Sequence, residues 1–234
     1  MYSRWRSARS RGWGCHSSLL ILQAMVFAMG DPSQAQEMAA RTIPTGDAEE
    51  RRAWAESALE AFDSGSEGDR SSSTTALNTT RLWALYFLSV DEKKWIGPAT
   101  ALADSLSAVD VPEPHHVEGL MAAVVVVRAK HARWPPNKVK HLRKGLSVLD
   151  RLVEGSPEEP GLRFVRLVSG YYLPFVLDRS KEVEEDFRVL ASILPGRDHD
   201  LPPQIFRFAV GFVLKYGEME GPARSLLQEA LGAP

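Results

Sequence analysis

Two arginines three positions apart, Arg163 and Arg166, have the spacing in this sequence that most clearly suggests chemistry. Residues three apart on a helix share one face, so both guanidinium groups can reach the same partner. A guanidinium fork binds carboxylates and phosphates through paired hydrogen bonds. We expect the pair to bond acids on neighbouring helices, such as Asp150, Glu182 or Asp186. The alternative is a binding role, in which both arginines line a groove that grips an anionic ligand or a peptide carboxylate.

Patterns that hold metals or carry catalysis are weak in the sequence. His115 and Glu118 have a spacing that can hold a metal on one helix, but the second such pair that a site needs is absent. Asp198-His199-Asp200 is more typical of a solvated turn than of a cation site. The chain contains no G-x-S-x-G, G-x-x-x-x-G-K or H-E-x-x-H motif. We therefore predict no catalytic residue, metal site or cofactor, and favour a protein that is not an enzyme.

Basic residues cluster between positions 131 and 144. The cluster consists of His131, Lys138, Lys140, His141, Arg143 and Lys144. The whole chain has 28 Lys and Arg against 30 Asp and Glu, a formal net charge of −2. This balance gives no general electrostatic attraction for nucleic acid. We interpret the cluster as a solvated face and expect no nucleic-acid partner.

The first 35 residues have the order of a secretory signal peptide. Several arginines up to Arg11 precede the apolar run Leu19–Met29, and Ser33 and Ala35 then supply small residues where a signal peptidase cuts. The apolar run is about half of the ~20 residues that span a bilayer, so a retained anchor is the weaker alternative. The only cysteine, Cys15, lies in this leader. We expect an exported protein, periplasmic or extracellular, with no membrane span after the leader is removed.

The residues after the expected leader are typical of helices separated by proline and glycine breakers. A helix at 47–62 is followed by a Ser/Gly-rich linker at 63–73, so residues 36–74 form an N-terminal helix with its linker. Residues 75–234 form the helical-repeat domain. Its expected helices lie around 82–87 and over 98–109, 117–133, 137–154, 161–177, 180–194, 203–216 and 221–231.

One run favours a strand when taken alone. Val124–Val127 is β-branched throughout, and such runs are common in strands. The flanking segments Leu120–Ala123 and Ala129–Ala132 favour a helix, and no second strand exists to pair with the run. We predict a helix that is buried on most of its circumference, as in the interior of a layered helical body.

Small residues at regular spacing suggest how the helices stack. With Ala230 at the last small position of the tetratricopeptide pattern, Gly211 and Ala223 occupy the other two. Farther upstream, Gly145 occupies a small position in the same way, whereas Arg207 stands where the pattern requires a large apolar residue. Small residues are needed where two helix backbones approach closely. We expect an all-α fold of antiparallel helix pairs stacked as a tetratricopeptide-like array, with an irregular helical bundle as the alternative.

Residues between Val117 and Leu190 combine a lysine, a glycine, a leucine-rich helix, an R-F-x-R segment and flanking prolines. They are Pro136, Lys138, Gly145, Leu149, Asp150, Pro157, Arg163–Leu167, Pro174 and Asp186. In this pattern the chain resembles uncharacterised exported all-helical, tetratricopeptide-like proteins of Bacteroidota-type bacteria. Where that group often has a glutamate before R-F-x-R, this chain has Gly161 and Leu162. The resemblance implies an exported helical protein and transfers no catalytic residue.

Repeated helix pairs without catalytic motifs indicate a binding role. We expect a non-enzymatic binding or scaffolding module of the cell envelope that engages a protein or peptide through a helical-array groove. The alternative is a small-molecule-binding protein or enzyme with a pocket near Arg163 and Arg166, beside a kink at Pro174. A homo-oligomer whose groove is closed by its own copy is the third hypothesis.

Overall fold

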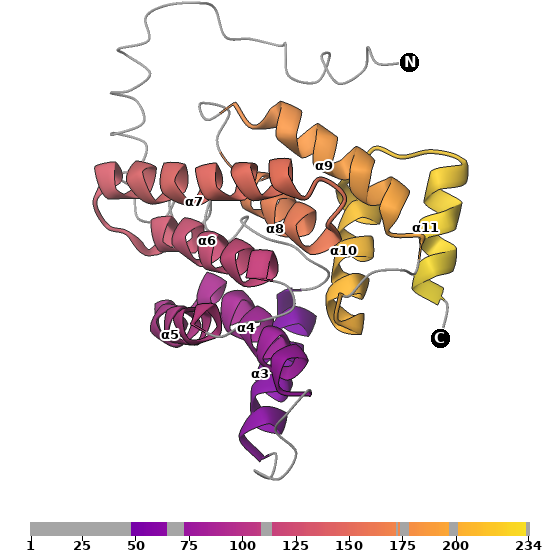
Figure 1. Cartoon of the computed structure of the whole chain (residues 1–234). Helices are drawn as coiled ribbons and strands as arrows, with labels where there is room; N and C mark the ends of the chain where they lie inside the picture. The colour runs from indigo at the N-terminus through magenta and orange to yellow at the C-terminus, as the bar shows by residue number, and fades with distance from the viewer. Residues whose placement is uncertain are drawn as a thin grey trace, which may run out of the picture. The chain divides into compact units, whose positions relative to one another are not determined.

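The computed structural model in Figure 1 describes residues 48–64, 73–108, 114–171, 173, 178–196 and 201–232. These residues form helices and connections and contain no strand. The elements are α3 (Ala48–Ser64), α4 (Ser73–Asp91), the short 3-10 helix η1 (Lys93–Trp95), α5 (Ile96–Ser107), α6 (Pro114–His131), α7 (Pro135–Gly155), α8 (Pro160–Tyr171), α9 (Ser180–Ile193), α10 (Pro203–Tyr216) and α11 (Pro222–Gly232). The prediction of an all-α fold is therefore confirmed for this part of the chain. Within it, no helix is both long enough and apolar enough to cross a bilayer.

Some of the predictions fall on residues outside the described ranges. They include the secretory leader over residues 1–35, with Cys15 inside it, and most of the expected linker, residues 65–72. Pro174 and the tripeptide Asp198–Asp200 also lie outside these ranges.

The sequence predicts a helix over 161–177 that kinks or stops at Pro174, and the helix in the structure is shorter than this range. The helix α8 ends at Tyr171, and the backbone N–H of Leu173 donates to the carbonyl of Gly170 at 3.1 Å in a tighter final turn. If the helix continued, a proline at position 174 would clash with the carbonyl four residues earlier, which is that of Gly170. The helix therefore stops before the proline instead of continuing through it.

The helix α3 packs against α4 and the core. Ala55 is fully buried, and the Trp54 ring makes edge-to-face contacts with Phe87 at 5.9 Å and with Phe208 at 5.7 Å between ring centroids. Aromatic pairs in this geometry add to the stabilisation that burial provides. The N-terminal helix is therefore docked by packed aromatic side chains.

The helix α6 lies at the centre of the packing and contacts α4, α5, α7 and α8. Val124, Val126 and Val127 are all buried, and Val125 is half-buried. Contact with four other helices leaves little of its circumference free. The prediction of a buried helix through the valine run is confirmed.

The helices α6 and α7 lie side by side (Figure 1). They approach closely at Gly145. A Cβ atom at Gly145 would stand 2.6 Å from the carbonyl oxygen of Ala122 and 3.0 Å from the backbone nitrogen of Val126. Gly211, the other glycine at an expected small position, has no neighbouring atom within 4 Å of such a Cβ. The close backbone approach that the repeat pattern requires is therefore present at Gly145 and absent at Gly211.

Candidate functional site

Both arginines of the R-F-x-R segment lie on α8, where they are buried and bonded to one carboxylate. Arg166 donates from Nε to Asp186 Oδ2 at 2.9 Å and from Nη2 to Oδ1 at 2.7 Å. Arg163 donates from Nη1 to Asp186 Oδ1 at 2.9 Å. The side chains of Arg163, Arg166 and Asp186 are 3%, 5% and 1% exposed. The α8 arginines thus form, with Asp186 on α9, a buried charge cluster of the kind that ties two helices together.

Further acids surround this cluster. Arg163 Nη1 also donates to Glu185 Oε1 at 2.8 Å, and this bond lowers the pKa of the Glu185 carboxyl. Arg166 Nη1 lies 3.5 Å from Asp150 Oδ1, which Arg179 contacts as well. Each guanidinium group thus has carboxylate partners within the protein.

Glu182 differs from its expected role. It was one of the acids predicted to pair with the arginines of α8. In the structure, Glu182 Oε1 instead lies 3.5 Å from Nη1 of Arg179. Both residues belong to the start of α9, three positions apart, where such pairs form readily. The acids that reach the α8 arginines are Asp186, Glu185 and Asp150.

A recess of about 360 Å³ adjoins this cluster, and we call it the arginine recess. It is lined by Asp150, Val153, Glu154, Pro157, Arg163, Arg166, Lys181, Glu182 and Glu185. Its four acidic side chains outnumber its three basic ones, and an incoming anion would have to replace carboxylates that already bond the guanidinium groups. The recess is therefore a poor site for an anionic ligand.

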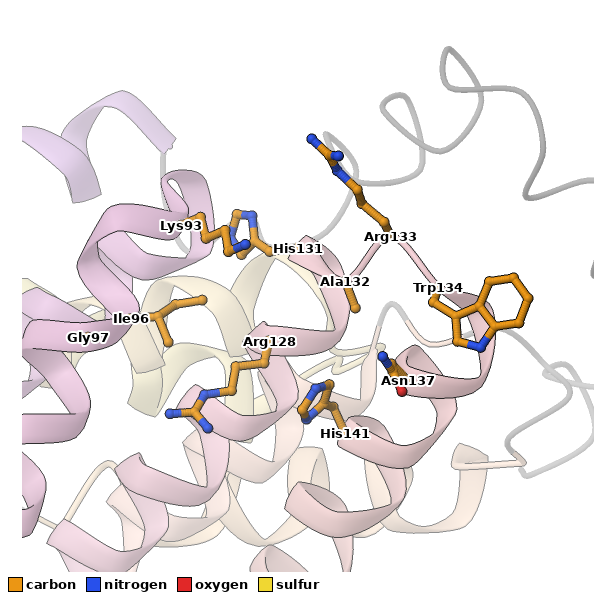
Figure 2. A pocket seen from close by; sticks show the side chains of 10 residues that line it. All are labelled: Lys93, Ile96, Gly97, Arg128, His131, Ala132, Arg133, Trp134, Asn137 and His141. Carbon is orange, nitrogen blue, oxygen red and sulfur yellow. The ribbon is translucent and has the colours of Figure 1, made fainter.

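A larger hollow of about 590 Å³ lies where the start of α5, the end of α6 and the start of α7 meet (Figure 2). We call it the basic cleft. It is lined by Lys93, Ile96, Gly97, Arg128, His131, Ala132, Arg133, Trp134, Asn137 and His141. No acidic side chain occurs among these described residues. A concave surface lined by one sign of charge concentrates ligands of the opposite sign.

The inner wall of the basic cleft is held by hydrogen bonds. Arg128 on α6 donates from Nη2 to the hydroxyl of Thr100 on α5 at 2.9 Å. His131 Nε2 lies 2.8 Å from the carbonyl oxygen of Ser89, and since a carbonyl only accepts, this nitrogen carries the proton. These two bonds fix the directions of the basic groups that face the hollow.

The histidine on the α7 side carries little charge at neutral pH. Burial lowers the pKa of His141 below its ordinary value of 6.5, and the nearby Arg128 and Lys140 lower it further. The permanent positive charge of the basic cleft therefore comes from Lys93, Arg128 and Arg133. Acidification therefore adds charge at His141 at a lower pH than it would at an ordinary histidine.

The start of α7 offers few backbone donors to an anion. Pro135 and Pro136 have no N–H group, and the N–H groups of Asn137 and Lys138 already donate to the carbonyl of Trp134 at 3.0 and 3.2 Å. The usual anion site at a helix N-terminus needs free N–H groups. Recognition in the basic cleft must therefore rely on side chains.

The rim of the basic cleft carries an exposed aromatic ring. Trp134 in the α6–α7 connection is 64% exposed, and Figure 2 shows Arg133 and Trp134 projecting from this connection. Ile96 and Ala132 provide apolar surface inside the hollow. An exposed tryptophan beside cations is a typical feature of binding surfaces.

Sequence reasoning found only part of the basic cleft. Of the basic cluster predicted between positions 131 and 144, His131 and His141 line the hollow, whereas Lys93 and Arg128 come from outside that cluster. The available signal was the breaker Trp134-Pro135-Pro136, because connections between helices usually lie on the surface.

The expected histidine–glutamate pair does not converge. His115 is exposed, and Glu118 forms an ion pair with Arg151 on α7.

The neighbouring His116 is buried, and its Nε2 lies 2.7 Å from Glu159 Oε1. Glu159 also accepts the backbone N–H groups of Gly161 and Leu162, so it caps α8. Within the described ranges, no group of three His, Cys, Asp or Glu side chains is arranged to hold a metal ion.

Comparison with known proteins gave no match. No family model matches the chain, and neither a curated protein nor a solved structure matches it significantly. The tetratricopeptide-like stacking and the resemblance to exported proteins of Bacteroidota-type bacteria therefore stay predictions. The helical fold and the geometry of the two hollows carry the functional argument.

Proposed function

We propose that this chain is a non-enzymatic binding module of the cell envelope that engages a protein or peptide partner through the basic cleft. The observation that carries the proposal is a hollow of about 590 Å³ with basic side chains on several elements and no acid among its described lining residues. Hollows of this size hold ligands or peptide side chains, and their charge selects the partner. The location in the envelope rests on the order of residues 1–35 alone.

The side chains of the basic cleft favour holding a partner over reacting with it. The described lining residues offer cations, the imidazoles of His131 and His141, an amide and apolar surface, but no hydroxyl, thiol or carboxylate group. Covalent catalysis usually pairs a base such as histidine with a nucleophile of this kind. We infer that binding is the whole task of this site.

The tetratricopeptide-like array is part of this proposal. The close approach of α6 and α7 at Gly145 supports it, because stacked helical hairpins depend on such contacts. The alternative, a small-molecule site near Arg163 and Arg166, has weaker support, since both guanidinium groups already bond Asp186.

The double variant Lys93→Gln/Arg133→Gln is expected to bind an acidic probe about tenfold more weakly than the parent, because each exposed charge contributes up to about 1 kcal/mol. The probe is a short oligoglutamate peptide, and the measurement is isothermal titration calorimetry at low salt. Both residues are exposed, so their replacement leaves the helical packing intact.

The matched control is Arg207→Gln/Lys215→Gln, which removes the same charge from exposed positions on α10. It is expected to change the affinity less than about twofold. Equal losses in the two double variants, or no binding by the parent protein, would contradict the proposed function.

A further inference from the structure

We infer that the partner segment held in the basic cleft is an acidic peptide that also carries an aromatic or large apolar side chain. Its carboxylates pair with Lys93, Arg128 and Arg133, and its apolar side chain packs against Trp134. This inference rests on the proposed function and names the chemistry of the partner.

The positive charges are distributed over separate elements. Lys93 belongs to η1, Arg128 to α6 and Arg133 to the α6–α7 connection, and Figure 2 shows them extending from different parts of the wall. A compact anion such as inorganic phosphate needs donors that converge on one point. Several carboxylates spaced along an extended chain fit distributed cations better.

The closed N-terminus of α7 argues against a phosphate group as the main ligand. Phosphate sites commonly use free backbone N–H groups at a helix start. Here the first two residues of the helix are prolines, and the next two N–H groups bond the carbonyl of Trp134. The hydrogen-bond donors that remain in the basic cleft are flexible side chains. Such side chains pair readily with carboxylates whose positions vary along a peptide.

Trp134 supplies the apolar part of the recognition. Its side chain is 64% exposed, whereas Trp95, the tryptophan before α5, is partly buried and packs against the core. Covering an exposed indole with an aromatic or large apolar side chain is favourable, because the contact removes apolar surface from water. Its position at the rim places this contact directly beside the carboxylate-binding groups.

A single-stranded nucleic acid fits the surface less well. Proteins that bind single strands usually combine a basic groove with several aromatic rings on which successive bases stack. Trp134 is the only aromatic residue among the large apolar side chains that are exposed in the described part of the chain.

The experiment compares four fluorescent probes by anisotropy on the full-length protein. The first is a short glutamate-rich peptide with one central phenylalanine, the second replaces this phenylalanine with alanine, and the third replaces the glutamates with glutamines. The fourth is a single-stranded DNA of the same net charge. We expect the first probe to bind most tightly, the second about fivefold more weakly, and the third at least about tenfold more weakly.

Trp134→Ala tests the aromatic contact separately, with Leu226→Ala as the matched loss of an exposed apolar side chain on α11. The Trp134 variant is expected to bind the phenylalanine and alanine peptides equally, whereas the Leu226 variant keeps the fivefold difference. Such coupling between two side chains is not produced by a general loss of stability.

The outcomes separate this inference from the proposed function. In one set of outcomes, the double variant Lys93→Gln/Arg133→Gln weakens binding, but the DNA binds most tightly or the Trp134 variant binds as the parent protein does. Either result overturns the inference of an acidic peptide with an aromatic side chain, and the basic cleft remains a binding site. Binding of all probes that is unaffected by the double variant overturns both.

Discussion

Asp186→Ala is expected to lower the free energy of unfolding by about 3–5 kcal/mol, because it leaves buried guanidinium groups without their shared carboxylate. Asp186 accepts hydrogen bonds from both Arg163 and Arg166, and all three side chains are at least nine-tenths buried. The remaining acids, Glu185 and Asp150, contact these arginines from more exposed positions and replace the lost charge only in part.

Chemical denaturation followed by circular dichroism measures this loss. Glu185→Ala is the matched control, since Glu185 bonds Arg163 but is 44% exposed, and its removal is expected to cost less than about 1 kcal/mol. Equal losses in the two variants would show that the buried cluster does not hold α8 to α9. Asp186→Asn, which keeps an acceptor oxygen but loses the charge, is expected to fall between them.

Gly145→Ala and Gly211→Ala are expected to change stability in opposite directions. At Gly145 the new Cβ would stand 2.6 Å from the carbonyl oxygen of Ala122, a backbone atom, so α6 and α7 must separate. Such overpacking costs about 1–3 kcal/mol, more than alanine gains in helix propensity. At Gly211 the new Cβ meets open space, so alanine is expected to stabilise the protein by up to about 1 kcal/mol.

Thermal unfolding of the two glycine variants beside the parent protein is the measurement. Both glycines lie inside helices, so differences in propensity cancel and the packing contribution remains. A Gly145→Ala protein as stable as Gly211→Ala would contradict the close approach of α6 and α7 and remove the main support for the stacked helical pairs.

The sequence predicted most of the helical fold because local signals mark each helix. Proline and glycine breakers separated the helices, and the flanks of Val124–Val127 identified a helix against the β-branched run itself. The range 161–177 places the end of α8 too late, whereas the kink or stop expected at Pro174 is closer to the observed end at Tyr171. Gly145 and Gly211 look alike in the repeat pattern, and only the neighbouring helix distinguishes them.

The candidate sites show the limit of sequence reasoning more clearly. Arg163 and Arg166 were found because they are neighbours on one helix, and Asp186 was named among their expected partners. The basic cleft was missed because Lys93 and Arg128 meet only after α5 packs against α6. Basic residues that are close together in the sequence point to different faces of a helix. Of the basic cluster between positions 131 and 144, only His131 and His141 therefore line the hollow.

The most direct test of the account is hydrogen–deuterium exchange of the full-length protein with and without the glutamate-rich phenylalanine peptide. Backbone amides slow their exchange where a ligand suppresses local opening. We expect slower exchange over residues 93–97 and 128–141, which contain the basic cleft, and no change over 178–186. Slower exchange confined to 150–166 and 178–186, around the arginine recess, would contradict the account and favour the small-molecule alternative.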